Sequence, residues 1–111
     1  MEILEQRHGA VMVVRPQGAL LEADVNAFRR RVSDVIQKSL GRFVLDASQI
    51  AYTDSKGLEA ILDISEELNG GGQSLRLCCA NETLREVLDL TDISPLVEHY
   101  EDVGTAVRSF L

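Results

Sequence analysis

The chain has 111 residues, 45% of them hydrophobic and 26% charged, and its formal net charge is −7. This length suits one domain with one core, and the composition is ordinary for a globular fold. The acidic charge disfavours binding to nucleic acid, because such a surface repels the phosphate backbone.

Two short extended runs, at residues 3–7 and 11–15, open the chain. His8 and Gly9 lie between them and can form a tight hairpin turn. Pro16 is expected to end the second run, because proline cannot donate to a strand ladder. The chain therefore begins with a predicted β-hairpin.

From Glu22 the apolar residues fall at the spacing of one face of an amphipathic helix, which ends before Gly41. Strand and helix then alternate to the end of the chain. We expect strands at residues 43–45, 75–79 and 96–100. We expect the remaining helices at residues 58–68, after the N-cap Asn81, and at residues 103–111.

This order predicts an α/β fold. Alternating strands and helices build a largely parallel sheet with right-handed crossovers, and the opening hairpin adds one antiparallel pair. We therefore expect one domain over residues 1–111, with a mixed, mostly parallel sheet of about five strands and about four helices. No internal repeat or linker divides it.

Polar residues gather where the strand at residues 43–45 leads toward the helix that contains Leu58. Ser55 lies at the predicted N-terminus of that helix, where free backbone N–H groups can receive an anion. A phosphate on Ser55 would add about −1.5 to −2 charges, with Lys56 as a neighbouring cation and Asp54 as a like charge. The alternative is a purely structural role, in which these residues only cap the helix, as Thr, Asp and Ser often do.

The stretch from Phe43 to Leu58, FVLDASQIAYTDSKGL, resembles the signature of the STAS family, named for sulfate transporters and anti-sigma factor antagonists. Its pattern is an apolar strand, an Asp-Leu-Ser-like turn, and an Asp-Ser-Ser-Gly-Leu run that opens a helix. The resemblance covers nearly the whole chain, and it also includes residues 17–20, 70–77 and 81–93. It therefore implies a STAS-type domain of the bacterial anti-sigma factor antagonist group.

The resemblance implies a phosphorylation switch. In bacterial antagonists the serine after the motif Asp is phosphorylated by a serine kinase of the histidine-kinase-like ATPase fold, which also acts as an anti-sigma factor. A metal-dependent serine phosphatase reverses the modification. By position Ser55 resembles the acceptor, and the unphosphorylated protein is expected to bind the kinase. The protein itself is then a binding module and not an enzyme.

Six residues are expected to contact the partner by the same resemblance. They are Asp54, Lys56, Gly57, Leu21, Glu22 and Asp24. Two of them depart from the family pattern: Lys56 replaces a small residue, and Leu21 stands where many antagonists carry Asp. These departures leave open which partner is bound, and whether it belongs to a sigma-factor system.

Two other functions stay open. The chain could be an unphosphorylated STAS scaffold subunit of a transport or signalling complex, with Ser55 as a plain cap. An enzyme is disfavoured, because neither His8 nor His99 has the spacing of a base for Ser55. Asp46 and Asp54 could form an acid pair, but no phosphate-binding glycine loop accompanies them.

We expect no cofactor, no metal site and no membrane insertion. Cys78 and Cys79 are the only cysteines, and two adjacent thiols without a third are interpreted as reduced residues at a strand end. No apolar run approaches the ~20 residues that span a bilayer. The N-terminus lacks the basic start and apolar centre of a signal peptide, so a cytoplasmic location is expected.

Overall fold

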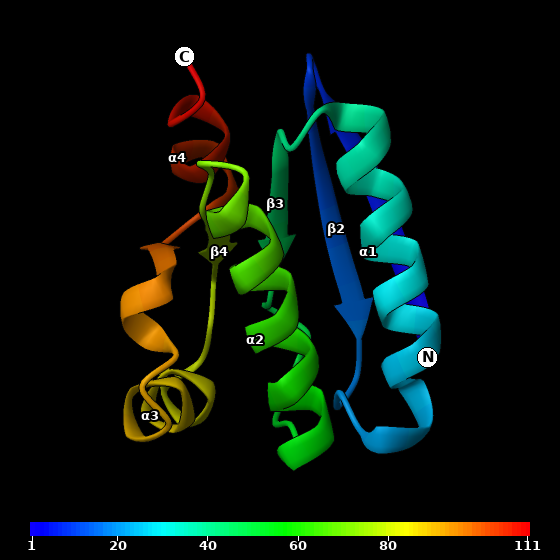
Figure 1. Cartoon of the computed structure of the whole chain (residues 1–111), viewed down its shortest axis with the longest axis vertical. Helices are drawn as coiled ribbons and strands as arrows, with labels where there is room; N and C mark the ends of the chain where they lie inside the picture. Colours follow the sequence, from blue (N-terminus) through cyan, green and yellow to red (C-terminus); the bar gives the residue numbers. More distant parts are fainter.

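The computed structural model describes residues 1–111 and contains one five-stranded sheet with its strands in chain order (Figure 1). The strands are β1 (Glu2–His8), β2 (Val11–Gln17), β3 (Phe43–Asp46), β4 (Leu75–Cys78) and β5 (Val97–Tyr100). The helices are α1 (Val25–Ser39), α2 (Ser55–Gly70), α3 (Glu82–Leu90) and α4 (Val103–Arg108). Two 3-10 turns, η1 (Glu22–Asp24) and η2 (Ser94–Leu96), precede α1 and β5.

The topology confirms the predicted fold class. β1 pairs with β2 in the antiparallel direction, and every later pair of neighbours is parallel. Each parallel step is connected by a helical crossover, as the alternating sequence pattern requires. The result is a mixed, mostly parallel sheet with an opening hairpin and four α-helices.

Two details of the hairpin differ from the sequence prediction. His8 pairs with Val11, so the two-residue turn is Gly9-Ala10, and His8 is a half-buried strand residue. Gly9 has a φ of +63°, which glycine adopts without steric cost. Pro16 does not end β2 but lies within it, beyond Val14, where the pairing with β3 stops. At Pro16 the strand has only β1 as a neighbour, which is where a sheet tolerates proline.

Two apolar clusters hold the sheet between its helices. A cluster of 20 buried residues fills the space between the sheet and helices α1, α2 and α3. A cluster of five buried residues lies on the opposite face, against α4. Strand alternation explains the division, because Leu75 and Leu77 of β4 join the larger cluster while Cys78 joins the smaller one.

The helix ends use ordinary local chemistry. Asn81 caps α3 as predicted, because its Oδ1 accepts a hydrogen bond of 2.7 Å from the N–H of Leu84. α1 ends in two left-handed residues, Leu40 with a φ of +55° and Gly41 with a φ of +82°. No helix combines the length and the apolar character needed to cross a membrane.

The parallel arrangement decides where polar loops collect. The parallel strands β3 and β4 have their carboxyl ends at the same end of the sheet, and the amino-terminal end of α2 lies toward that end in Figure 1. Open α/β sheets commonly place their functional groups beyond the carboxyl ends of the strands. The larger apolar cluster lies behind α2 and keeps the helix seated on the sheet.

A matched pair of leucine truncations tests this description of the core. Leu45→Ala removes a side chain of β3 that is 0% exposed, and we expect it to lower the free energy of unfolding by about 2–5 kcal/mol. Leu90→Ala, at a residue that is 75% exposed, should change it by less than about 0.5 kcal/mol. Urea denaturation followed by circular dichroism measures both. Equal losses in the two variants would contradict the assignment of Leu45 to the core.

Candidate functional site

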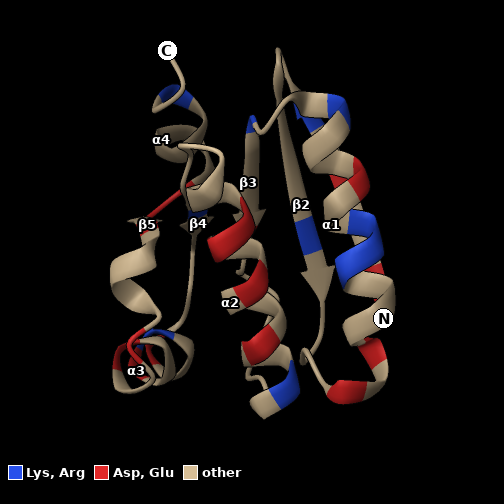
Figure 2. Cartoon of the chain, viewed as in Figure 1, with Lys and Arg blue, Asp and Glu red and all other residues tan.

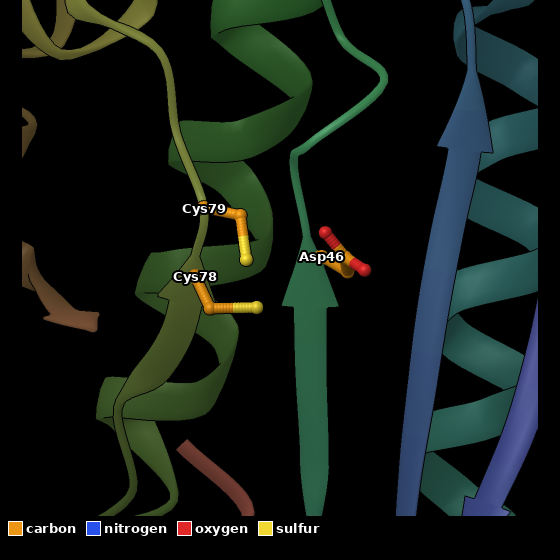
Figure 3. A group of neighbouring side chains, drawn as sticks. All are labelled: Asp46, Cys78 and Cys79. Atoms are coloured by element: carbon orange, nitrogen blue, oxygen red, sulfur yellow. The ribbon is translucent and has the colours of Figure 1, made fainter. Parts of the chain in front are cut away.

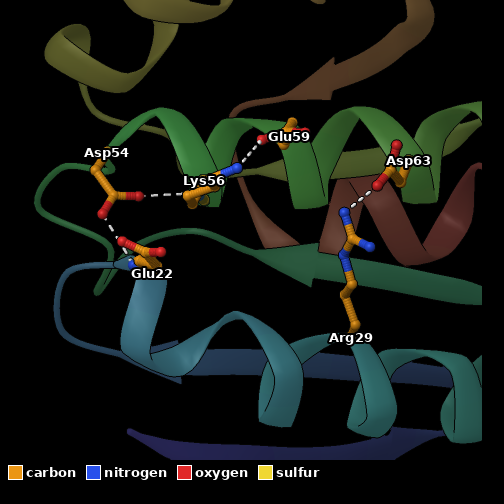
Figure 4. A network of polar contacts seen from close by, with 7 residues as sticks. Glu22, Arg29, Asp54, Lys56, Glu59 and Asp63 are labelled. Atoms are coloured by element: carbon orange, nitrogen blue, oxygen red, sulfur yellow. Dashed lines mark hydrogen bonds and ion pairs between the residues drawn. The ribbon is translucent and has the colours of Figure 1, made fainter.

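The start of α2 and the segment before η1 lie side by side, although they are far apart in the sequence (Figure 4). The N–H of Leu20 donates to the carbonyl of Tyr52 at 3.1 Å, and the N–H of Asp54 donates to the carbonyl of Leu20 at 3.3 Å. Leu20 also forms an isolated parallel bridge with Thr53. These bonds join the residues before η1 to the residues before α2, and the two segments form one surface.

The Asp54 carboxylate completes this junction. Oδ1 accepts a hydrogen bond of 2.8 Å from the N–H of Gly57, so Asp54 is the N-cap of α2. Oδ2 accepts a hydrogen bond of 2.9 Å from the N–H of Glu22, the first residue of η1. These backbone donors, that of Gly57 first, hold the pKa of Asp54 below its ordinary value because they stabilise the charged form.

Gly57 permits the close approach of the two segments. It is buried, and a Cβ at this position would overlap Thr53 Oγ1 and the carbonyl oxygen of Leu20. Thr53 Oγ1 itself donates to that carbonyl at 2.8 Å. Gly57 therefore lies beneath the surface, and the structure supports a packing role for it and not a direct contact with a partner.

Ser55 is the first residue of α2 and is exposed. Its hydroxyl makes no hydrogen bond within the chain, in contrast to the Thr53 hydroxyl beside it. Ser55 lines none of the four surface cavities. The hydroxyl is therefore free on an open surface, where another protein can reach it.

The charges around Ser55 are mostly negative. Lys56 Nζ lies 3.3 Å from a carboxylate oxygen of Glu59, so this cation is already paired within α2. Farther along the helix, Asp63 pairs with Arg29 of α1 (Figure 4). Figure 2 shows acidic residues along the visible face of α2 and acidic residues in the turn that contains η1. A phosphate at Ser55 would therefore enter an acidic neighbourhood.

The expectation that free helix amides would receive this phosphate is met only in part. The N–H of Gly57 is already bonded to Asp54, and the N–H of Leu58 donates to the carbonyl of Asp54. The N–H groups of Ser55 and Lys56 are the first two of the helix and have no partner within it. The anion position that the sequence suggested is thus shared with the carboxylate of Asp54.

The residues expected to contact a partner fall into one region, with different exposure. Glu22 and Lys56 are exposed, whereas Leu21, Asp24 and Asp54 are half-buried. Their backbone segments are the two that the Asp54 carboxylate connects. The structure therefore brings these positions of the two segments together in one region.

Other candidate catalytic groups lie elsewhere. His99 Nε2 is 3.0 Å from Ser94 Oγ, at the start of η2, and His8 lies at the end of β1. Neither histidine bonds Ser55. Asp46 does not form an acid pair with Asp54, because its carboxylate lies beside two cysteines while that of Asp54 bonds backbone amides.

Comparison with known protein families decides the family. The model of the STAS domain matches residues 2–106. The chain belongs to the STAS domain family. The resemblance seen in the sequence is thereby confirmed, and the STAS match extends over both segments of the Ser55 surface.

The relatives of this STAS domain include anti-sigma factor antagonists. The anti-sigma F factor antagonist of Paenibacillus polymyxa is 24% identical over 108 residues, with 96% of this chain and 92% of that protein covered. An anti-sigma factor antagonist from Mycobacterium paratuberculosis has a TM-score of 0.83 at 21% identity, covering 97% of this chain and 92% of that one. The Bacillus cell fate determinant SpoIIAA in its phosphorylated form has a TM-score of 0.73 at 18% identity, covering 99% of this chain and 100% of that one.

The sequence analysis did not predict how the segment before η1 and the start of α2 are held together. The bond from Glu22 N–H to Asp54 spans 32 positions, and no local pattern signals it. The N-cap role of Asp54 did carry a signal, because an Asp three residues before a helical N–H is a common cap. The burial of Gly57 carried a weaker one, since glycine in a first helical turn often marks a close approach.

A glycine pair tests the close packing beneath Ser55. Gly57→Ala is expected to lower the free energy of unfolding by about 1–3 kcal/mol, because the new methyl group overlaps backbone and Thr53. Gly70→Ala is the matched control at the other end of α2, where nothing lies within 4 Å. That variant should be neutral or more stable by up to about 1 kcal/mol. Denaturant unfolding of both variants gives the comparison, and a Gly57→Ala protein as stable as the control would contradict the packing described here.

The pKa of Asp54 yields a prediction in acid. Since the folded pKa is depressed, this carboxylate stabilises the fold above its unfolded pKa of about 3.9, and the contribution is lost as the pH falls through the folded pKa. Asp54→Asn keeps an N-cap side chain but does not titrate. The stability difference between the wild type and Asp54→Asn should therefore shrink below a pH of about 4.

Thermal unfolding of the two proteins at several pH values measures this difference. Asp102 also has a depressed pKa, caused first by the N–H of Thr105, but it is present in both proteins and cancels. A difference that stays constant across the acid range would show that the Asp54 carboxylate gains nothing from its two backbone donors.

Proposed function

We propose that this STAS domain is a protein-binding switch that is controlled by phosphorylation of Ser55. The observation that carries the proposal is the free, exposed hydroxyl at the first residue of α2, next to the surface that η1 completes. Because Ser55 lines no cavity, this surface suits docking to another protein better than binding a small substrate, which needs a concave pocket. The protein acts as a regulator of signal transduction and is not an enzyme.

The antagonist relatives support an anti-sigma factor as the partner, and the sequence resemblance adds the kinase and the phosphatase. The unphosphorylated domain binds a serine protein kinase of the histidine-kinase-like ATPase fold, which also restrains a transcription factor as an anti-sigma factor. A metal-dependent serine phosphatase restores the unphosphorylated form. These proteins meet the domain in the cytoplasm. The structure of SpoIIAA in its phosphorylated form, a protein with this fold, supports control of this domain by phosphorylation.

The charge at the site supports a direct electrostatic mechanism. Phosphorylation adds about −1.5 to −2 charges at Ser55. Asp54 already accepts from the N–H of Gly57, and Lys56 is already paired with Glu59, so only the N–H groups of Ser55 and Lys56 remain to bond this charge. The phosphate therefore projects negative charge outward. A partner surface that accepts the unmodified helix start is repelled or left with an unpaired charge.

The modification site is tested by mass spectrometry of the protein from its own cells and after incubation with its kinase and ATP. We expect one phosphate in the segment from Thr53 to Lys56, and none in Ser55→Ala. Ser48→Ala is the matched control, because Ser48 is an exposed serine of the same loop. Undiminished phosphorylation of Ser55→Ala would contradict the assignment, and an unmodified protein from cells in every growth condition would favour the scaffold alternative.

The effect on binding is a separate prediction. Ser55→Asp should weaken the affinity for the kinase at least tenfold, because it places a fixed negative charge at the docking surface. Ser55→Ala and Ser48→Asp should bind nearly as well as the wild type. Isothermal titration calorimetry with the purified kinase measures all of these affinities. An equal loss in Ser48→Asp would indicate a general charge effect and not a site at Ser55.

A further inference from the structure

Cys78, Cys79 and Asp46 come together at the carboxyl ends of two neighbouring strands, away from the junction around Asp54. Asp46 ends β3 and is paired with Cys78, which ends β4. One ligand atom from each of the three side chains lies within 4.8 Å of the others. Figure 3 shows the side chains of Cys78, at the end of β4, and Cys79, just after it, on the side that faces the end of β3.

The backbone at Cys79 explains why two adjacent thiols meet. Successive residues of a strand point to opposite faces, so a regular strand would hold the two thiols apart. Cys79 has a φ of +63°, a left-handed conformation that is uncommon outside glycine and that turns its side chain toward that of Cys78. Hydrogen bonds from Ala47 N–H to the Cys78 carbonyl at 2.9 Å and from Cys79 N–H to the Tyr100 carbonyl at 3.1 Å hold this turn on both sides.

We propose that Cys78, Cys79 and Asp46 form a site for a thiophilic divalent metal ion of the zinc and cadmium class. Two thiolates and a carboxylate are ligands that zinc accepts, and three protein ligands leave a fourth position for water or an external ligand. Bonds of about 2.0–2.3 Å place tetrahedral ligands about 3.5–3.8 Å apart, so a spacing within 4.8 Å has to close by about 1.3 Å at most. The third ligand, which the sequence did not indicate, comes from β3.

The surroundings of the three ligands fit a cation. Asp46 Oδ1 accepts a hydrogen bond of 2.9 Å from the N–H of Ser48, which orients the carboxylate and leaves Oδ2 for a metal. The carboxylates of Asp46 and Asp102 place negative charge beside the two sulfur atoms, and a cation would offset this charge. Binding of the ion releases the two thiol protons.

An approach to the site is open. Cys78 and Asp46 are buried, but Cys79 is partly exposed. Asp46 also lines a cavity of about 200 Å³ on the sheet face beside α4, together with Val13 of β2 and Val103 of α4. An ion can therefore reach the ligands without unfolding of the core. The site does not involve Ser55, so its test is independent of the proposed switch.

Titration of the reduced protein with Cd²⁺ tests the metal site, because cadmium–thiolate bonds absorb in the ultraviolet. We expect one equivalent of Cd²⁺ to produce this charge-transfer band and Zn²⁺ to displace it. Cys79→Ser should remove at least half of the band. Asp46→Asn, which retains an oxygen for the Ser48 N–H, should keep the band but weaken the apparent affinity at least tenfold.

Glu86→Gln on α3 is the control for binding to exposed carboxylates, and it should leave both the band and the affinity unchanged. Circular dichroism and the thermal midpoint confirm that each variant is folded, and Zn²⁺ should raise the midpoint of the wild type but not that of Cys79→Ser. Absence of the band at one equivalent in the wild type overturns the proposal. So does a band that Cys79→Ser retains in full, or an affinity that Asp46→Asn leaves unchanged.

Discussion

The carboxylate of Asp54 is bonded to two backbone amides that lie on different segments, those of Gly57 and Glu22. Each amide belongs to the first turn of a helical element and would otherwise lack a partner. One side chain therefore caps α2 and fixes η1 against it. Together with the backbone bonds of Leu20 to Tyr52 and Asp54, this contact holds the two distant segments of the surface around Ser55 in register. The absence of a side chain at Gly57, above the carbonyl of Leu20, is what lets them approach so closely.

The same contact determines what a negative charge at Ser55 can do. In many phosphate sites the helix amides and a nearby cation absorb the charge and order the segment. Here the Asp54 carboxylate already accepts the hydrogen bond of the Gly57 N–H, and Lys56 forms an ion pair with Glu59. The proposed phosphorylation would therefore change the surface potential and would not refold α2. Such a change would act on a protein that docks there, which suits a domain whose relatives include anti-sigma factor antagonists.

Most of the fold could be predicted from local pattern. The apolar residues of β3 and β4, the helical spacing of α1 and α2, and the cap at Asn81 each lie within a few residues of sequence, and the structure confirms them. The position of Ser55 at the start of α2 followed from the same reasoning. The misjudged features depend on tertiary neighbours. Pro16 is tolerated within β2 because the pairing with β3 has already ended, and the link from Glu22 to Asp54 connects segments with no shared local signal.

The close approach of Cys78 and Cys79 to Asp46 is another feature that local sequence patterns do not predict. Strand alternation separates neighbouring side chains, and only a left-handed residue at the strand end reverses this. Such a conformation persists where surrounding hydrogen bonds over-determine it, as the bonds to Ala47 and Tyr100 do here. The large apolar cluster on the other face supplies stability that does not depend on these loops. The loops at the carboxyl ends of the parallel strands can therefore hold both the left-handed residue Cys79 and the exposed start of α2. Residues in these loops can be replaced without changing the core.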